Sequence, residues 1–142
     1  MVSSFNALGQ ITEFFYDAVG RRVAVETPLG YRSTTVYNLA GQVVSSIDAL
    51  GNNTTYAYDD AGNQIRVTNP LGYSITSIYA SNSNLLSAVQ NQIGYLTTYT
   101  YDLNGRQVSR KTRNSSVVTW VYDNAGQNTV ITNELGRHFT TS

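Results

Sequence analysis

The chain has 142 residues, a formal net charge of zero and only 13% charged residues, so no basic face is indicated and nucleic acid is not an expected partner. It has no cysteine, which excludes disulfides and thiolate metal sites, and the single His138 cannot form a histidine metal cluster. No apolar run reaches transmembrane length and no signal-peptide pattern opens the chain, so we expect no membrane span and no export signal within it.

Two short motifs recur along the chain with one period. A tyrosine followed four residues later by glycine recurs at steps of 21 or 22 residues, and an apolar residue followed by glycine keeps the same period. Self-similarity at a fixed short period is the signature of a repeat protein. The first series consists of Tyr16, Asp17, Gly20, Tyr37, Gly41, Tyr58, Asp59, Gly62, Tyr79, Tyr101, Asp102, Gly105, Tyr122, Asp123 and Gly126. The second series consists of the turn glycines Gly9, Gly30, Gly51, Gly72, Gly94 and Gly136.

Each repeat is predicted to be a β-hairpin. In the repeat that begins after Gly20, residues 21–26 and 31–37 are rich in β-branched and aromatic side chains and are bounded by turn residues. The same pattern predicts units at about residues 10–30, 31–51, 52–72, 73–94, 95–115 and 116–136, within a single array over residues 1–142. Since neither face of these strands is uniformly apolar, we expect an all-β fold in which antiparallel hairpins form one curved or spiralling sheet with water on both sides.

The turn residues explain the spacing. In residues 59–62, Asp59 can cap backbone N–H groups and Gly62 can adopt the left-handed conformation, and residues 69–72 do the same with Pro70 at the second position. An odd period keeps the tyrosines on one face only if one of the two connections shifts the alternation, through an even-length loop or a bulge. We therefore expect the two turns to differ in geometry.

Two repeats depart from the pattern. In the fourth, Ser83 occupies the glycine position of the first turn, and one extra residue precedes Gly94. In the fifth, Asn114-Ser115 replaces the apolar residue and glycine of the second turn. Because asparagine tolerates positive φ, we expect that turn to be kept.

The periodic side chains allow functional and structural interpretations. The periodic aspartates could be calcium ligands or catalytic carboxylates; they are Asp17, Asp59, Asp102 and Asp123. The nine-residue repeat of calcium-binding β-helices is absent, so capping of the turns is the favoured role. The tyrosines could stack on sugar rings, although cross-strand pairing is the simpler role. The basic clusters, Arg21, Arg22, Arg110, Lys111 and Arg113, are expected on solvated strand faces. His138 is the only histidine that could serve as the base of a catalytic triad, and it lies beyond the last complete repeat, so no enzyme and no cofactor are expected.

The motifs resemble those of the Rhs family, the YD-repeat proteins of bacteria. The resemblance is carried by Tyr16-Asp17-Ala18-Val19-Gly20-Arg21, by Pro28-Leu29-Gly30 and by Thr54-Thr55-Tyr56-Ala57-Tyr58-Asp59, and it covers about residues 8–141. It implies a large secreted or surface protein in which a spiralling β-sheet of many repeats forms a hollow shell. In polymorphic toxins, such a shell encloses a C-terminal toxin domain.

The sequence therefore favours a non-catalytic structural scaffold, a segment of a β-shell that encapsulates a toxin or other cargo polypeptide. Its expected partners are further YD repeats of the parent chain or an enclosed toxin domain, and its expected location is secreted or at the cell surface as part of a larger protein. The alternative is a surface adhesion module that binds carbohydrate through the repeated tyrosine face.

Overall fold

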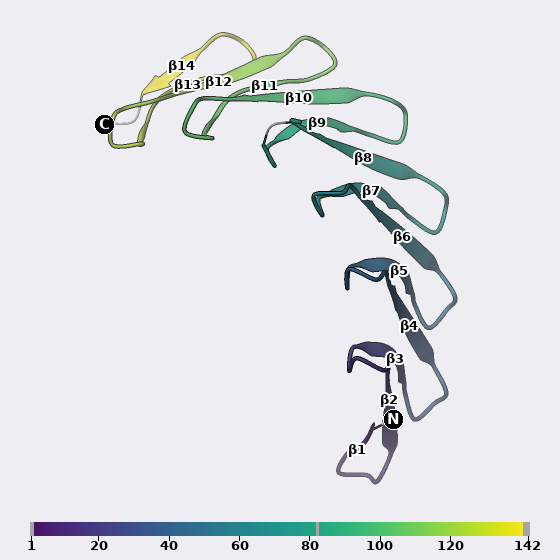
Figure 1. The fold of residues 1–142 in the computed structure, drawn as a ribbon. Helices are drawn as coiled ribbons and strands as arrows, with labels where there is room; N and C mark the ends of the chain where they lie inside the picture. Colours follow the sequence, from purple (N-terminus) through teal and green to yellow (C-terminus); the bar gives the residue numbers. More distant parts are fainter. Residues whose placement is uncertain (1, 82, 141–142) are drawn as a thin grey trace. The chain divides into compact units, whose positions relative to one another are not determined.

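A computed structural model describes residues 2–81 and 83–140 of the chain. Met1, Asn82 and residues 141–142 lie outside the described part, so the predicted bounds of the array at residues 1 and 142 do as well. The described residues form strands and turns without a helix, and the strand order in the sheet follows the chain order from β1 to β14 (Figure 1). The predicted all-β fold of antiparallel hairpins is confirmed.

The interior strands are five or six residues long, which is the usual length of strands in globular proteins. The strands are β1 (Val2–Phe5), β2 (Ile11–Tyr16), β3 (Arg22–Glu26), β4 (Arg32–Tyr37), β5 (Val43–Ile47), β6 (Asn53–Tyr58), β7 (Gln64–Thr68), β8 (Ser74–Tyr79), β9 (Leu86–Gln90), β10 (Leu96–Tyr101), β11 (Gln107–Lys111), β12 (Val117–Tyr122), β13 (Asn128–Thr132) and β14 (His138–Thr140).

The two kinds of turn share one hydrogen-bond pattern. In the turn after β2, the Asp17 N–H donates to the Arg21 carbonyl at 2.9 Å and the Gly20 N–H donates to the Asp17 carbonyl at 3.1 Å. The turn after β3 repeats both bonds, from Thr27 and from Gly30, at 2.9 Å each. All 11 glycines of the chain close such turns with φ between 73° and 87°, a region that residues with a Cβ rarely adopt. The expected difference in geometry between the two turns is not found in this pattern.

The shift in alternation lies instead in a bulge at the start of the strand that follows the repeat tyrosine, as the pairs after Tyr16, Tyr37, Tyr79, Tyr101 and Tyr122 show. In β2–β3, Tyr16 pairs with Arg22 but Phe15 pairs with Ala24, so Val23 is an extra residue. The same register shift occurs in β4–β5, β8–β9, β10–β11 and β12–β13. The β3–β4 ladder, which follows the other kind of turn, runs without a shift. Because side chains alternate between the two faces of a strand, an odd period alone would move successive tyrosines to opposite faces. The extra residue of the bulge restores the alternation and keeps the tyrosines on one face.

The sheet is a single layer. Among the described residues, Ala24 and Ala88 are the buried hydrophobic residues, with 4% and 5% of their surface exposed. The apolar residues before the second-series glycines remain exposed, as shown by Leu29 at 77% and Leu50 at 82%. Within each compact unit, stability therefore comes from ladders, turns and contacts between neighbouring hairpins, because the described strands of that unit bury few hydrophobic side chains.

The two irregular turns adapt in different ways. In the fourth repeat, the Ala80 N–H donates to the Leu85 carbonyl at 2.9 Å, so this turn accommodates the extra residue. In the fifth, the turn is kept, with the Thr112 N–H donating to the Ser116 carbonyl at 3.0 Å. Its positive φ of 60° falls on Ser115, in the glycine position, and not on Asn114 as the tolerance of asparagine suggested.

Contacts within the chain define two compact units. One comprises residues up to Tyr58 together with Arg66–Ser74, and the other comprises Asp59–Ile65 and the residues from Ile75 onward. The division into six sequence repeats stays a prediction. In residues 2–81 and 83–140 there is no helix long and apolar enough to cross a membrane.

Candidate functional site

The repeated tyrosine joins one repeat to the previous one. Within the described part of the chain, five tyrosine hydroxyls each donate a hydrogen bond to the backbone carbonyl 15 residues earlier. The pairs are Tyr37 with Arg22 at 3.1 Å, Tyr58 with Val43 at 2.8 Å, Tyr79 with Gln64 at 3.4 Å, Tyr101 with Leu86 at 2.8 Å and Tyr122 with Gln107 at 2.9 Å. For Tyr16, the residue at that distance is Met1, which lies outside the described part.

The bulge explains why this carbonyl needs a side-chain donor. Arg22 lies at the register shift of β2–β3, and the ladder to β4 begins only at Ala24, which pairs with Thr34. The Arg22 carbonyl thus lies beyond the ladder, and the Tyr37 hydroxyl supplies the hydrogen bond that strand pairing does not. Burial, together with nearby Tyr99, raises the pKa of the Tyr101 hydroxyl above its usual 10.0.

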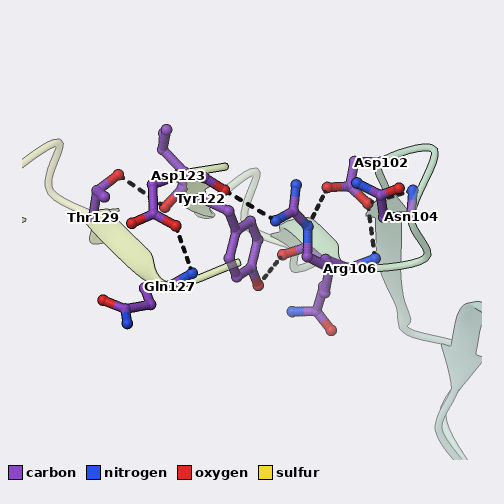
Figure 2. Close-up of polar contacts among 9 residues, drawn as sticks. Asp102, Asn104, Arg106, Tyr122, Asp123, Gln127 and Thr129 are labelled. Carbon is purple, nitrogen blue, oxygen red and sulfur yellow. Dashed lines mark hydrogen bonds and ion pairs between the residues drawn. The ribbon is translucent and has the colours of Figure 1, made fainter. Parts of the chain in front are cut away.

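The aspartate after the tyrosine caps its own turn. One oxygen of Asp17 accepts hydrogen bonds from the N–H groups of Val19 at 3.1 Å and Arg21 at 2.9 Å. Asp102 accepts the equivalent bonds from Asn104 and Arg106, both at 2.9 Å (Figure 2). Partial burial raises the pKa of the Asp17 carboxyl, but the hydrogen bonds and charge of Arg21 outweigh this effect, and the pKa lies below its usual 3.8.

The arginine that follows the turn glycine reaches from one repeat to the next. Arg21 Nε lies 2.7 Å from Asp17 Oδ2, and Arg21 Nη1 donates to the Asn38 carbonyl at 3.2 Å. Its guanidinium carbon lies 4.7 Å from the centre of the Tyr37 ring, within the range of a cation–π contact. With 34% of its side chain exposed, Arg21 is not on a solvated strand face, and that expectation is wrong for this residue.

The same arrangement recurs in the other unit. Arg106 Nε lies 2.6 Å from Asp102 Oδ2, Nη1 donates to the Asp123 carbonyl at 3.3 Å, and the guanidinium carbon lies 4.7 Å from the Tyr122 ring. Figure 2 shows this guanidinium between the Asp102 carboxylate and the backbone of Asp123, with the Tyr122 ring beside it. Sequence reasoning missed Arg106, although the signal was present: an arginine directly after the turn glycine in both the first and fifth repeats.

In two of the other repeats, the equivalent position makes weaker connections. Asn63 Nδ2 donates to Asp59 Oδ2 at 3.0 Å and to Asn84 Oδ1 at 3.2 Å, so it also links two turns. In the fourth repeat, whose turn is one residue longer, Leu85 takes the place of Arg21 in the turn hydrogen bond, and its Cδ2 lies 4.0 Å from the place a Cβ on Gly105 would occupy. The residue after the glycine is therefore the variable element of the junction.

The second turns are capped by side chains at their first position. Asp48 Oδ1 accepts from the N–H groups of Leu50 and Asn52, both at 2.9 Å, and Asn69 Oδ1 accepts from Leu71 and Tyr73, both at 3.0 Å. Asparagine and aspartate perform the same capping, which is the usual asparagine and aspartate turn chemistry. A charge is not required at this position.

The described residues contain no group of three or more His, Cys, Asp or Glu side chains placed to hold a metal ion. His138 Nδ1 lies 2.9 Å from Thr132 Oγ1; His138 is exposed and Thr132 is half-buried. A shallow hollow of about 430 Å³ is lined in part by Glu13 and Glu26, which face each other across β2–β3, and Arg32 lies 3.6 Å from Glu26.

Comparison with known proteins identifies the repeat. The RHS Repeat family model matches residues 37–74, which run from Tyr37 of one repeat into the second turn of the next. The search of curated proteins gave no match.

Solved structures with the same fold are toxin complexes. The structure of TcdB2-TccC3-Cdc42 aligns with a TM-score of 0.71 and 17% identity over 87% of this chain, and that of TcdB2-TccC3 with a TM-score of 0.70 and 18% identity over 87%. The Photorhabdus luminescens Tc holotoxin pore with the TccC3-D651A mutation aligns with a TM-score of 0.69 and 18% identity over 87%. The chain spans only 7–8% of the length of these proteins. The RHS Repeat match at residues 37–74, the periodic Tyr-Asp and glycine motifs and the shared fold together make this chain similar to proteins of the Rhs, or YD-repeat, family.

Proposed function

We propose that this chain is a non-catalytic segment of a β-shell wall that sequesters a toxin or other cargo polypeptide in a larger secreted or cell-surface protein. Its partners are further YD repeats of the parent chain and the enclosed polypeptide. The wall acts by steric exclusion. The side-chain contacts of the array join consecutive hairpins to one another.

The observation that carries the proposal is that the sheet has little buried core and that its contacts connect consecutive hairpins. A sheet in which Ala24 and Ala88 are the buried hydrophobic residues of the described part has no interior in which to hold a small substrate. Each repeat instead uses the tyrosine hydroxyl of the next repeat to satisfy its bulge, as Tyr101 does for Leu86. Such an array can be lengthened by adding repeats without redesigning a core, which suits a wall.

The tyrosine geometry does not favour the carbohydrate alternative. A tyrosine that binds sugar stacks its ring on the sugar and can add a hydrogen bond from its hydroxyl, but the Tyr58 and Tyr122 hydroxyls already donate to backbone carbonyls at 2.8 and 2.9 Å. The exposed Tyr31 and Tyr73 follow the other turn and do not belong to the regular tyrosine series. The wall role thus accounts for the repeated residue better than the adhesion role does.

Limited proteolysis of the parent protein tests the proposal. With the array intact, the polypeptide that follows the repeats should resist protease, and it should become sensitive when Tyr101 and Tyr122 are both changed to phenylalanine. Tyr31→Phe with Tyr73→Phe is the matched control and should leave protection intact. Equal digestion of that polypeptide in all three proteins would contradict a wall function, and saccharide binding on a glycan array would favour adhesion.

A further inference from the structure

Two arginines connect side-chain capping in one turn to the backbone of the next turn. Arg21 holds the Asp17 carboxylate with Nε at 2.7 Å and the Asn38 carbonyl with Nη1 at 3.2 Å. The same Asn38 carbonyl accepts the Gly41 N–H at 3.1 Å, the bond that closes the next turn. One carbonyl therefore receives both the closing bond of its own turn and the bond from the preceding repeat.

The position of the guanidinium supports a direct coupling of the two turns. Arg21 Nη1 lies 3.6 Å from the point where a Cβ on Gly41 would be, and Arg106 Nη1 lies 3.6 Å from the same point on Gly126. In each case, the guanidinium also stacks on the tyrosine that precedes the next turn, Tyr37 or Tyr122. Two independent copies of one geometry, in different compact units, indicate a recurrent device of the fold.

Arg32 provides an internal comparison. It also stacks on an aromatic ring, with its guanidinium carbon 4.4 Å from the Phe15 ring, and it lies 3.6 Å from a carboxylate, Glu26. Glu26 and Arg32 are register partners that flank a single turn, so this ion pair does not connect two turns. Removing Arg32 deletes the same charge and a similar stack without touching a turn-to-turn connection.

We propose that Arg21 and Arg106 are inter-repeat staples that couple the opening of consecutive Tyr-Asp turns, so that two neighbouring turns open as one cooperative unit. When the turn of Asp17 opens, the carboxylate that fixes Nε is lost, and the guanidinium no longer has a fixed orientation toward Asn38 and Tyr37. The Asn38 carbonyl then loses its hydrogen bond from Arg21, and the Gly41 N–H bond to the same carbonyl breaks more often. This inference rests on the junction geometry and does not depend on the shell function.

Amide hydrogen exchange on the 142-residue chain tests the coupling at a distance. In Arg21→Ala, the Gly41 amide should exchange about 5- to 30-fold faster, because loss of the Arg21 contacts lowers the free energy of local opening at that turn. Asp17→Ala should also increase the exchange rate of the Gly41 amide, although Asp17 makes no bond to that turn. Arg32→Ala should leave the Gly41 rate unchanged. Acceleration confined to the amides of residues 17–21 would overturn the proposal.

Coupling must also run in reverse, because linkage between two sites is reciprocal. Tyr37→Leu, which removes the ring under the guanidinium, should accelerate exchange of the Arg21 amide, and Tyr37→Phe, which keeps the ring, should affect it less. If Arg21→Ala does not fold, Arg21→Lys can replace it, because lysine keeps the charge and the aliphatic chain but lacks the planar guanidinium. Arg21→Lys should still increase the exchange rate of the Gly41 amide. The Arg106→Ala variant repeats the measurement at Gly126. Unchanged Gly126 and Gly41 rates in folded variants would reject the staple.

Discussion

The Tyr37 hydroxyl donates a 3.1 Å hydrogen bond to the carbonyl of Arg22, so a side chain of one repeat satisfies a backbone group of the repeat before it. Tyrosine is suited to this position because its ring spans the gap beyond the end of the β3–β4 ladder and its hydroxyl supplies the missing donor. The recurrence of tyrosine once per period thus follows from the bulge, which leaves one carbonyl per repeat outside the strand pairing.

Loss of the hydroxyl should destabilise the array by the value of one hydrogen bond. Tyr101→Phe keeps the ring but leaves the Leu86 carbonyl without this donor, and we expect a loss of about 0.5–1.5 kcal/mol in the free energy of unfolding, measured by urea titration. Tyr31→Phe, at an exposed position, should change stability by less than about 0.5 kcal/mol. Equal losses in both variants would show that the Tyr101 bond contributes nothing of its own.

The glycine of the Tyr-Asp turn should resist substitution. Gly62 has φ of 87°, and Gly62→Val forces a β-branched residue into the left-handed region at a cost of about 1–2 kcal/mol or more. Ser83 occupies the corresponding place in the fourth repeat, and within the described residues only Ser115 is a non-glycine with positive φ. Ser83→Val should therefore cost less in the same urea titration. A similar loss at both positions would mean that the left-handed conformation is not what selects glycine.

Acid should weaken the turns capped by aspartate. The Asn63 amide donates a hydrogen bond to the Asp59 carboxylate, and with the backbone N–H bonds it holds the Asp59 pKa below its usual 3.8 despite partial burial. A pKa that is lower in the folded chain gives stability that is present above about 3.8 and is lost as the pH falls through the folded value. We expect unfolding midpoints in urea to be constant from pH 7 to pH 5 and to fall below pH 4.

Asp59→Asn separates capping from charge. The turns opened by Asn69 and Asn133 show that an amide oxygen accepts the same backbone bonds, so the variant should fold at pH 7. It should lose less stability between pH 5 and pH 3 than the unmodified chain does, because asparagine does not titrate. An acid-induced loss of the same size in both proteins would assign the acid sensitivity to other carboxylates.

The sequence predicts the repeat and its turns well because each depends on local rules. Gly62 and Asp59 follow turn chemistry that acts within four residues, and the period of 21 required a bulge or an even-length loop. The choice between these two depends on how Tyr16 and Phe15 pair across β2–β3, which local propensity does not determine. The Arg21 contact with Asn38 spans 17 positions and depends on how the intervening strands β3 and β4 pair, so local sequence rules placed this arginine in solvent.

The outer strands should make the 142-residue chain associate when it is produced alone. In the part of the chain that the structure describes, β1 pairs with β2 and β14 pairs with β13, and each has its other side open. Unpaired N–H and C=O groups on an edge are a template for addition of another strand, and charged side chains on an edge oppose it. Sedimentation at several concentrations should show self-association, and Ser4→Lys combined with Phe139→Lys should reduce it without loss of β-structure. Fusion of further RHS repeats to both ends should have the same effect by covering the edges. A monomer with a sharp thermal transition at every concentration would mean that the edges are already protected, and the wall-segment proposal would lose its main physical argument.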